Sequence, residues 1–107
     1  MPEDMLQATI TGDPDGERVT IAVAGQLDLA SIDLLRDAVD QVVRTGTELL
    51  VFDLSGLTFM DSTGIGLLAV THNEVLARSG KVAVEGANDL ILRLLEISGL
   101  ADQLEVR

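Results

Sequence analysis

Residues 48–66 read Glu-Leu-Leu-Val-Phe-Asp-Leu-Ser-Gly-Leu-Thr-Phe-Met-Asp-Ser-Thr-Gly-Ile-Gly, and this stretch decides the fold. It contains a short continuous apolar run, Leu49–Phe52, which is typical of a central parallel strand buried on both faces. We therefore predict a strand over Glu48–Leu54 and a loop over Ser55–Asp61. The segment from Ser62 onward has helical spacing and predicts a helix that begins at this serine.

Strand and helix patterns alternate on either side of this stretch. We predict further strands over Leu6–Thr11, Arg18–Ala24 and Lys81–Val84, and a shorter one over Leu104–Val106. Gly25 is expected to end the strand over Arg18–Ala24. Residues 12–16 form a dense turn cluster that makes the first two strands a hairpin. Apolar residues at helical spacing predict three helices, from Asp28 or Ser31 to Thr45-Gly46, from Ser62 to Arg78 and from Ala87 to Ser98.

The same spacing predicts which side of each helix faces the core. The expected inward residues are Leu34, Leu35, Ala38, Val39, Val42 and Val43 in the first helix, Leu67, Leu68, Val75 and Leu76 in the second, and Leu90, Ile91, Leu94 and Leu95 in the third. The order β-β-α-β-α-β-α, with a short final strand, predicts an α/β fold. We expect a mostly parallel mixed sheet of four to five strands with three to four helices. Residues 1–107 are predicted to form a single domain.

The composition excludes several classes of partner. The chain carries 18 Asp and Glu against 7 Lys and Arg, a formal net charge of −11, which argues against nucleic acid and against anionic membrane surfaces. Phe52 and Phe59 are its only aromatic residues, so it has no platform on which bases or sugars could stack. The acidic charge fits either a basic partner or a protein with no charge-selected partner.

Other absences point to a cytoplasmic protein. The chain has no cysteine, which excludes disulfides and thiolate catalysis. No apolar run reaches the roughly 18–20 residues that span a bilayer. The first residues, Met1-Pro2-Glu3-Asp4, are acidic where a secretory signal would be basic.

Ser62 is the candidate for chemistry because it lies at or next to the start of a helix. The free backbone N–H groups and the dipole at such a position stabilise negative charge, including a phosphate. Gly64 and Gly66 leave the first turn with little side chain, so a second protein can approach the backbone closely. The alternative is purely structural: Asp61 or Ser62 caps the helix, and the glycines let it pack tightly on the sheet.

Four segments of the chain together resemble the signature of bacterial anti-sigma factor antagonists, which have the STAS fold. They are Asp53-Leu54-Ser55-Gly56, the run from Phe59 to Gly66, Gly25-Gln26-Leu27-Asp28 and Ile97-Ser98-Gly99-Leu100. The resemblance covers nearly the whole chain in the same element order. Asp-Ser-Thr-Gly alone would be a weak signal, and the apolar strand before it and the upstream Gly-x-Leu-Asp make the signal specific.

The resemblance implies a partner-switching role in transcription regulation, such as control of stress response or sporulation. The unphosphorylated antagonist binds a partner that is both anti-sigma factor and serine kinase, and a sigma factor is released. The kinase, which itself binds the ATP, phosphorylates the serine that matches Ser62 and so ends binding; a PP2C-type phosphatase restores the antagonist. The chain would then be no enzyme and need no cofactor. The alternative is a scaffold or orphan STAS module without a sigma factor pathway.

The resemblance and the position at one sheet edge also predict a partner-binding surface. Its residues are Gly25, Gln26, Leu27, Asp28, Asp61, Ser62, Thr63, Gly64, Ile65 and Gly66. By the resemblance, Asp28 lies beside the phosphorylation site. Gln26 stands where the family usually has Glu. Thr63 stands where many members have a second Ser, which makes Thr63 an alternative acceptor.

Two enzyme-like alternatives are weaker. Asp28, Asp53 and Asp61 could form an acidic cluster that holds Mg²⁺, as in receiver domains, but such domains need a Lys at the end of a later strand and Lys81 begins its strand. No Gly-rich loop with Lys-Ser/Thr is present, so the chain is not a P-loop protein. His72, the only histidine, is expected to point outward as a structural residue, with phosphohistidine chemistry as the alternative.

Overall fold

The structure, a computed structural model, describes residues 5–12 and 17–107. Its strands are β1 (Gln7–Gly12), β2 (Arg18–Leu27), β3 (Leu49–Met60), β4 (Lys81–Glu85) and β5 (Glu105–Val106). Its helices are α1 (Ile32–Thr45), α2 (Ser62–Ala77), α3 (Asp89–Ile97) and a short 3₁₀ helix, η1 (Leu100–Asp102). The predicted α/β fold and element order are confirmed. Most of the predicted turn cluster, residues 13–16, lies outside the described residues.

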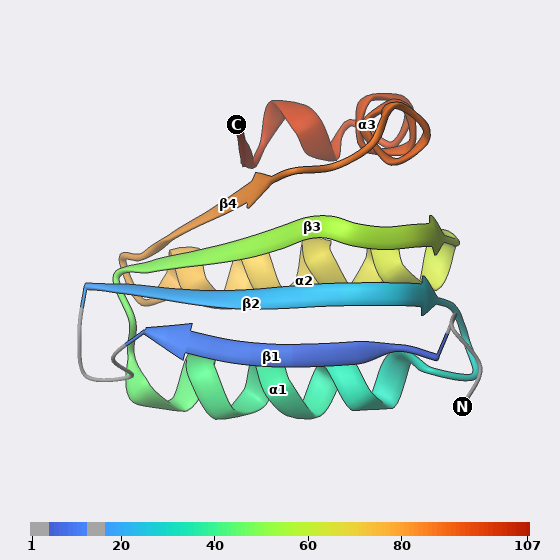
Figure 1. The fold of residues 1–107 in the computed structure, drawn as a ribbon. Coiled ribbons are helices and arrows are strands. Elements are labelled where there is room, and N and C mark those ends of the chain that lie inside the picture. Colours follow the sequence, from blue (N-terminus) through green and yellow to red (C-terminus); the bar gives the residue numbers. More distant parts are fainter. Residues whose placement is uncertain (1–4, 13–16) are drawn as a thin grey trace.

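The sheet is mixed, and its strand order follows the chain order, β1-β2-β3-β4-β5. β1 pairs antiparallel with β2, and the later neighbours are parallel. Each crossover between parallel strands leads to the next strand in the same direction across the sheet. Right-handed crossovers that all advance in one direction place their helices on one face of the sheet. In Figure 1, α1 and α2 both lie behind the strands, so the opposite face of β1, β2 and β3 is turned toward the viewer.

β3 runs through the centre of the sheet, where its apolar run forms the core. Phe52 pairs with Ile21 of β2 on one side and with Val84 of β4 on the other, and all three residues have an exposed fraction of 0%. Leu35 from α1, Leu68 from α2 and other aliphatic residues complete this core. Burial of such side chains is the main force that favours folding, so the predicted central strand is confirmed.

β3 is longer than predicted, and the expected loop over Ser55–Asp61 is wrong: the strand continues to Met60. Leu57 and Met60 are both 2% exposed, so their burial holds this second half of β3 on the core. Gly56, which resembles a turn residue, lies where two strands approach closely. A Cβ atom there would come within 2.8 Å of the Ala24 Cβ.

β2 is also longer than predicted, because Gly25 does not close it and the strand runs on to Leu27. Gly25 has a φ of 97°, a conformation that favours glycine. The register of the β2–β3 pairing shifts between Gly25 and Gln26. The glycine therefore accommodates an irregularity within the strand, as in a β-bulge.

The helix faces were predicted only in part. Leu35, Ala38, Leu67, Leu68 and most other expected residues are buried, whereas three leucines are exposed, with fractions of 50% for Leu34, 57% for Leu76 and 54% for Leu90. α2 is rich in apolar residues around its whole circumference, so periodicity could not separate its buried stripe from its outer face. Thr71 takes an inward position instead, and its hydroxyl donates to the Leu67 carbonyl at 2.7 Å.

Candidate functional site at the start of helix α2

Asp61 is the N-cap of α2, and Ser62 is the first helical residue. The Asp61 carboxylate accepts a hydrogen bond from the Thr63 backbone N–H at 2.9 Å. Ser62 is exposed, Thr63 is half-buried, and no described residue hydrogen-bonds the Ser62 hydroxyl. The capping alternative therefore applies to Asp61, and Ser62 has no capping role that would occupy its side chain.

The start of α2 is held in place by the ends of β2 and β3. Leu27 and Met60 are paired across the two strands, and the Asp61 N–H donates to the Leu27 carbonyl at 3.2 Å. Gly64 packs directly on this pair, since a Cβ there would lie 2.6 Å from Met60 Cγ and 2.9 Å from Leu27 Cδ2. The packing alternative thus explains Gly64. It does not explain Gly66, where an added Cβ would meet nothing within 4 Å.

Asp28 shapes the turn that follows β2. Its Oδ1 accepts hydrogen bonds from the N–H groups of Ala30 at 3.0 Å and Ser31 at 3.1 Å. The Ser31 hydroxyl in turn donates to the Gln26 carbonyl at 2.9 Å. Ser31 is the N-cap of α1, although its side chain makes no capping hydrogen bond. Asp28 and Asp61 directly follow the paired residues Leu27 and Met60, so the two turns emerge side by side.

Burial separates the predicted partner-binding residues into two groups. Gly25, Leu27 and Gly64 are buried and form the support beneath the site. The others lie at least partly at the surface: Gln26, Asp28, Asp61, Ser62, Thr63, Ile65 and Gly66. Only this second group presents side chains or backbone to a docked protein.

Two exposed hydrophobic residues at the same end of the sheet were missed by the sequence reasoning. Leu29 lies in the Asp28 turn with 77% of its surface exposed, and Phe59 is 42% exposed and pairs with Gln26. An apolar residue inside a polar turn, and one of only two aromatic residues in the chain, were signals available in the sequence. Exposed apolar side chains grouped at one end of a molecule are typical of protein-binding surfaces.

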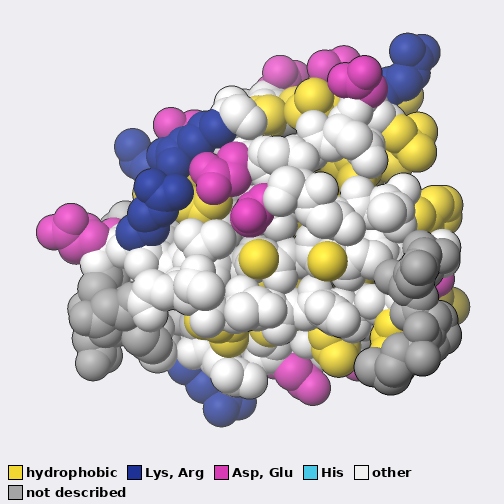
Figure 2. All heavy atoms as spheres, in the orientation of Figure 1, with side chains coloured by type: hydrophobic (Ala, Val, Ile, Leu, Met, Phe, Trp, Pro, Cys, Tyr) yellow, Lys and Arg dark blue, Asp and Glu magenta, His cyan; other side chains and the backbone are white. Residues whose placement is uncertain are grey.

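Basic side chains gather at the opposite end of the sheet. Of the seven Lys and Arg, four (Arg18, Arg78, Lys81 and Arg107) line one surface depression of about 850 Å³ at the amino ends of the parallel strands. Figure 2 shows Lys and Arg as a stripe on the left, while hydrophobic side chains appear along the right edge, toward which β2 and β3 run in Figure 1. Three glutamates, Glu17, Glu48 and Glu105, line the same depression, and Arg18 and Arg107 form ion pairs with Glu85 and Glu105, so much of this positive charge is balanced.

The enzyme-like alternatives gain no support from the geometry. Over residues 5–12 and 17–107, no group of three His, Cys, Asp or Glu is placed to hold a metal ion, so Asp28, Asp53 and Asp61 do not form the Mg²⁺ cluster considered above. Lys81 begins β4, as expected. His72 is half-buried, and its Nδ1 atom is buried without a hydrogen-bond partner among the described residues, so the expected outward orientation is wrong.

Comparison with known proteins settles the family. A family model described as the STAS domain matches residues 6–107. This chain belongs to the STAS domain family. Among its STAS relatives, the anti-sigma-B factor antagonist of Listeria monocytogenes is 31% identical over 94 residues, covering 87% of this chain and 82% of that protein. The anti-sigma-B factor antagonist of Bacillus subtilis is 28% identical over 88 residues, covering 82% and 80%.

Solved STAS structures have the same fold. An anti-sigma factor antagonist from Mycobacterium paratuberculosis has a TM-score of 0.87 and 23% identity, over 98% of this chain and 87% of that one. The Bacillus cell fate determinant SpoIIAA in its phosphorylated form has a TM-score of 0.72 and 22% identity, over 95% and 90%. The predicted STAS fold is thus confirmed. Within the described ranges, none of the helices has the length and apolar character needed to cross a membrane.

Proposed function

We propose that this STAS domain is an anti-sigma factor antagonist that is switched off by phosphorylation at Ser62. Its unphosphorylated form binds an anti-sigma factor, which then releases a sigma factor. The observation that carries the proposal is the exposed Ser62 hydroxyl, without a hydrogen-bond partner among the described residues, at the first position of α2. Relatives that are named anti-sigma-B factor antagonists support the partner class.

The local geometry favours Ser62 over Thr63 as the phosphate acceptor. Ser62 is exposed, whereas Thr63 is half-buried and its N–H is engaged by the Asp61 carboxylate at 2.9 Å. A kinase active site must surround the acceptor hydroxyl, and the Ser62 side chain is the more accessible of the two.

The phosphate would act on the partner rather than on the fold. Phosphorylation adds about −1.5 to −2 charges at neutral pH. Near the start of a helix this charge is tolerated, because the helix dipole favours anions there. Asp61 already occupies the Thr63 N–H, so the phosphate has to project outward beside this carboxylate. A docked partner would then meet added bulk and concentrated negative charge, and binding would be lost without unfolding of the antagonist.

The proposed surface for the anti-sigma factor includes exposed hydrophobic residues as well as the phosphate acceptor Ser62. Leu29 and Phe59 are exposed at the Ser62 end of the sheet, and each can enter a pocket on a partner. Large hydrophobic side chains at the centre of an interface often contribute most of the binding free energy. We therefore place Leu29 and Phe59 beside Gln26, Asp28, Ile65 and Gly66 in the surface that contacts the anti-sigma factor.

The proposed switch also requires two activities that the partners supply. The anti-sigma factor would itself be a serine kinase that binds ATP, and a PP2C-type phosphatase would remove the phosphate from Ser62. This chain contributes the acceptor and the docking surface.

The experiment combines phosphorylation with binding. The chain is purified from its own cells, and the proteins captured with it are identified. The captured kinase is then incubated with ATP and one of four proteins: the wild type, Ser62→Ala, Thr63→Val or Ser55→Ala. Ser55 is an exposed serine that serves as the control. We expect one added phosphoryl group in all except Ser62→Ala, and loss of kinase binding in the modified protein. Modification that persists in Ser62→Ala, or equal binding of both forms, would refute the switch. Capture of no anti-sigma factor would instead favour a scaffold role.

A further inference from the structure

The edge strand β1 lacks the features that usually keep a sheet edge from pairing. Its residues, Gln7–Gly12, include no charge and no proline, and its register with β2 has no shift. Natural proteins block edges with charged side chains, prolines and bulges. The other edge strand, β5, is only two residues long and carries Glu105. β1 therefore offers its outer backbone N–H and C=O groups to another strand.

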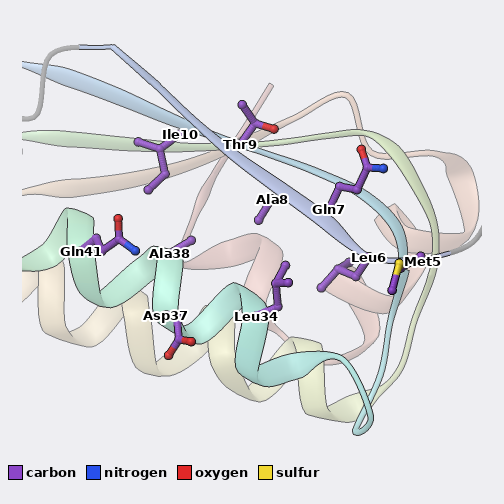
Figure 3. A pocket seen from close by; sticks show the side chains of 10 residues that line it. All are labelled: Met5, Leu6, Gln7, Ala8, Thr9, Ile10, Leu34, Asp37, Ala38 and Gln41. Carbon is purple, nitrogen blue, oxygen red and sulfur yellow. The ribbon is translucent and has the colours of Figure 1, made fainter. Parts of the chain in front are cut away.

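A groove between β1 and α1 runs beside this edge (Figure 3) and has a volume of about 670 Å³. Ala8 and Ile10 of β1 point toward α1, while Gln7 and Thr9 point away from it. On α1, the groove is lined by Leu34, an apolar residue that is 50% exposed. The strand edge and the groove thus form one strip, which we call the β1–α1 strip.

We propose that the β1–α1 strip joins two copies of this chain about a two-fold axis. β1 of one copy would pair antiparallel with β1 of the other, and the two α1 helices would pack antiparallel beneath them. Antiparallel pairing of identical strands satisfies two-fold symmetry, because each residue makes the same contact in both copies. β1 has 6 residues and α1 has 14, which gives both a length of about 20 Å. The two layers of the interface therefore match in length.

The polar residues of the strip indicate a second copy as its occupant, because α1 is complementary to itself when antiparallel. Asp37 and Gln41 are the polar residues of α1 that line the groove. In the two-fold arrangement, the Asp37 carboxylate of each copy faces the Gln41 amide of the other, which is a hydrogen-bond donor. Asp33 in the first turn, which already pairs with Arg36 of its own helix at 2.7 Å, and Arg44 in the last turn then meet as opposite charges at both ends. Parallel packing of the two α1 helices would instead place Asp37 beside Asp37 and Arg44 beside Arg44.

This interface is separate from the Ser62 site. β3, which leads to Ser62, is separated from the β1 edge by β2. Antiparallel joining of the two sheets makes their β3 strands point in opposite directions. The two Ser62 sites would therefore lie at opposite ends of the dimer, and each would remain open to its own partner. The inference does not rest on the proposed function.

The test measures the oligomeric state by analytical ultracentrifugation over a range of concentrations. We expect a reversible monomer–dimer equilibrium in the wild type. Thr9→Lys places like charges near each other on the paired strands and should weaken dimerisation about tenfold or more, whereas Thr20→Lys, one strand inward, should not. Leu34→Glu should weaken it too, and Leu76→Glu, an equally exposed leucine on α2, should not. Circular dichroism checks that each variant is folded.

Single-cysteine variants test the geometry independently, because the natural chain has no cysteine. Gln7→Cys, Thr9→Cys and Thr11→Cys are oxidised separately, with Thr20→Cys as the control from β2. We expect a disulfide-linked dimer from at least one β1 variant and none from Thr20→Cys, since a disulfide needs Cα atoms within about 7 Å. A wild-type monomer at all concentrations, or a dimer that neither Thr9→Lys nor Leu34→Glu weakens, would overturn the proposal.

Discussion

The Asp61 carboxylate accepts a hydrogen bond from the Thr63 backbone N–H, with 2.9 Å between Oδ1 and N. The two residues that form this hydrogen bond flank Ser62 in the sequence. The Ser62 side chain takes no part in the cap. One residue therefore holds the helix start in place while its neighbour stays available for modification. The structural and regulatory explanations of the Asp-Ser-Thr-Gly segment are thus compatible, because they apply to different residues.

Removal of this cap should lower stability by a modest amount. Asp61→Ala deletes the oxygen that accepts from Thr63 and should reduce the free energy of unfolding by about 1 kcal/mol. Asp61→Ser keeps a capping oxygen and should retain most of that stability. Urea unfolding followed by circular dichroism measures both variants. Equal stability of Asp61→Ala and the wild type would contradict the capping role.

The two glycines at the start of α2 should respond to alanine in opposite ways. Gly64→Ala forces a Cβ to within 2.6 Å of Met60 Cγ and should cost about 1–3 kcal/mol, the usual range for overpacking. Gly66→Ala adds a methyl group where nothing lies within 4 Å and should raise stability by about 0.5–1 kcal/mol through helix propensity. Thermal and urea unfolding of the pair provide the comparison. The packing explanation of Gly64 fails if the two variants shift in the same direction.

The two exposed hydrophobic residues should matter more for binding than for folding. Leu29→Ser removes a side chain that is 77% exposed, so stability should change little, within about 0.5 kcal/mol. Phe59 is 42% exposed and lies in β3, so Phe59→Ser should cost more, about 1 kcal/mol, and still leave the protein folded. If they anchor the anti-sigma factor, each should weaken its binding by more than about 1 kcal/mol. Isothermal titration calorimetry with the captured partner measures this change. Leu76→Ser, on the outer side of α2, is the control that should bind normally.

Two variants of Asp28 separate its charge from its role in the turn. Asp28→Asn keeps the Oδ1 acceptor for the N–H groups of Ala30 and Ser31, whereas Asp28→Ala removes it. Asp28→Ala should therefore lose about 1 kcal/mol of stability, and Asp28→Asn should lose little. If negative charge at Asp28 assists partner binding, both variants should bind more weakly. Normal binding by Asp28→Asn would show that the residue acts through the turn alone.

The central strand and the helix start could be predicted from sequence because their signals are local. The run Leu49–Phe52 is apolar without a break, and Asp61 followed by Ser62 and Thr63 is typical of a helix start. Both features depend on neighbouring residues, and the structure places Phe52 in the core and Asp61 at the cap. The family resemblance adds an expectation that local chemistry leaves open, namely that Ser62 is the residue that is phosphorylated.

The parts that could not be predicted depend on contacts between distant segments. Gly56 and Gly25 resemble turn residues in the sequence, yet Gly56 lies against Ala24 within a continuous β2–β3 pairing. The exposure of Leu29 depends on the turn that Asp28 and Ser31 form. Periodicity within one segment carries no information about such contacts, and this is why the exposed Leu29 and Phe59 were not predicted at this end of the sheet.

The sequential order of the five strands has a consequence for synthesis. Each new strand joins the sheet at the edge that the preceding strand has just formed, so no strand has to insert between two others. A nascent chain leaving the ribosome can therefore add β2, β3, β4 and β5 in turn, with α1, α2 and α3 closing over the core as they emerge. The chain emerges from its N-terminal side during synthesis, and a domain of this size gains its full stability as one unit. The order of assembly in this sheet can thus be the order of translation.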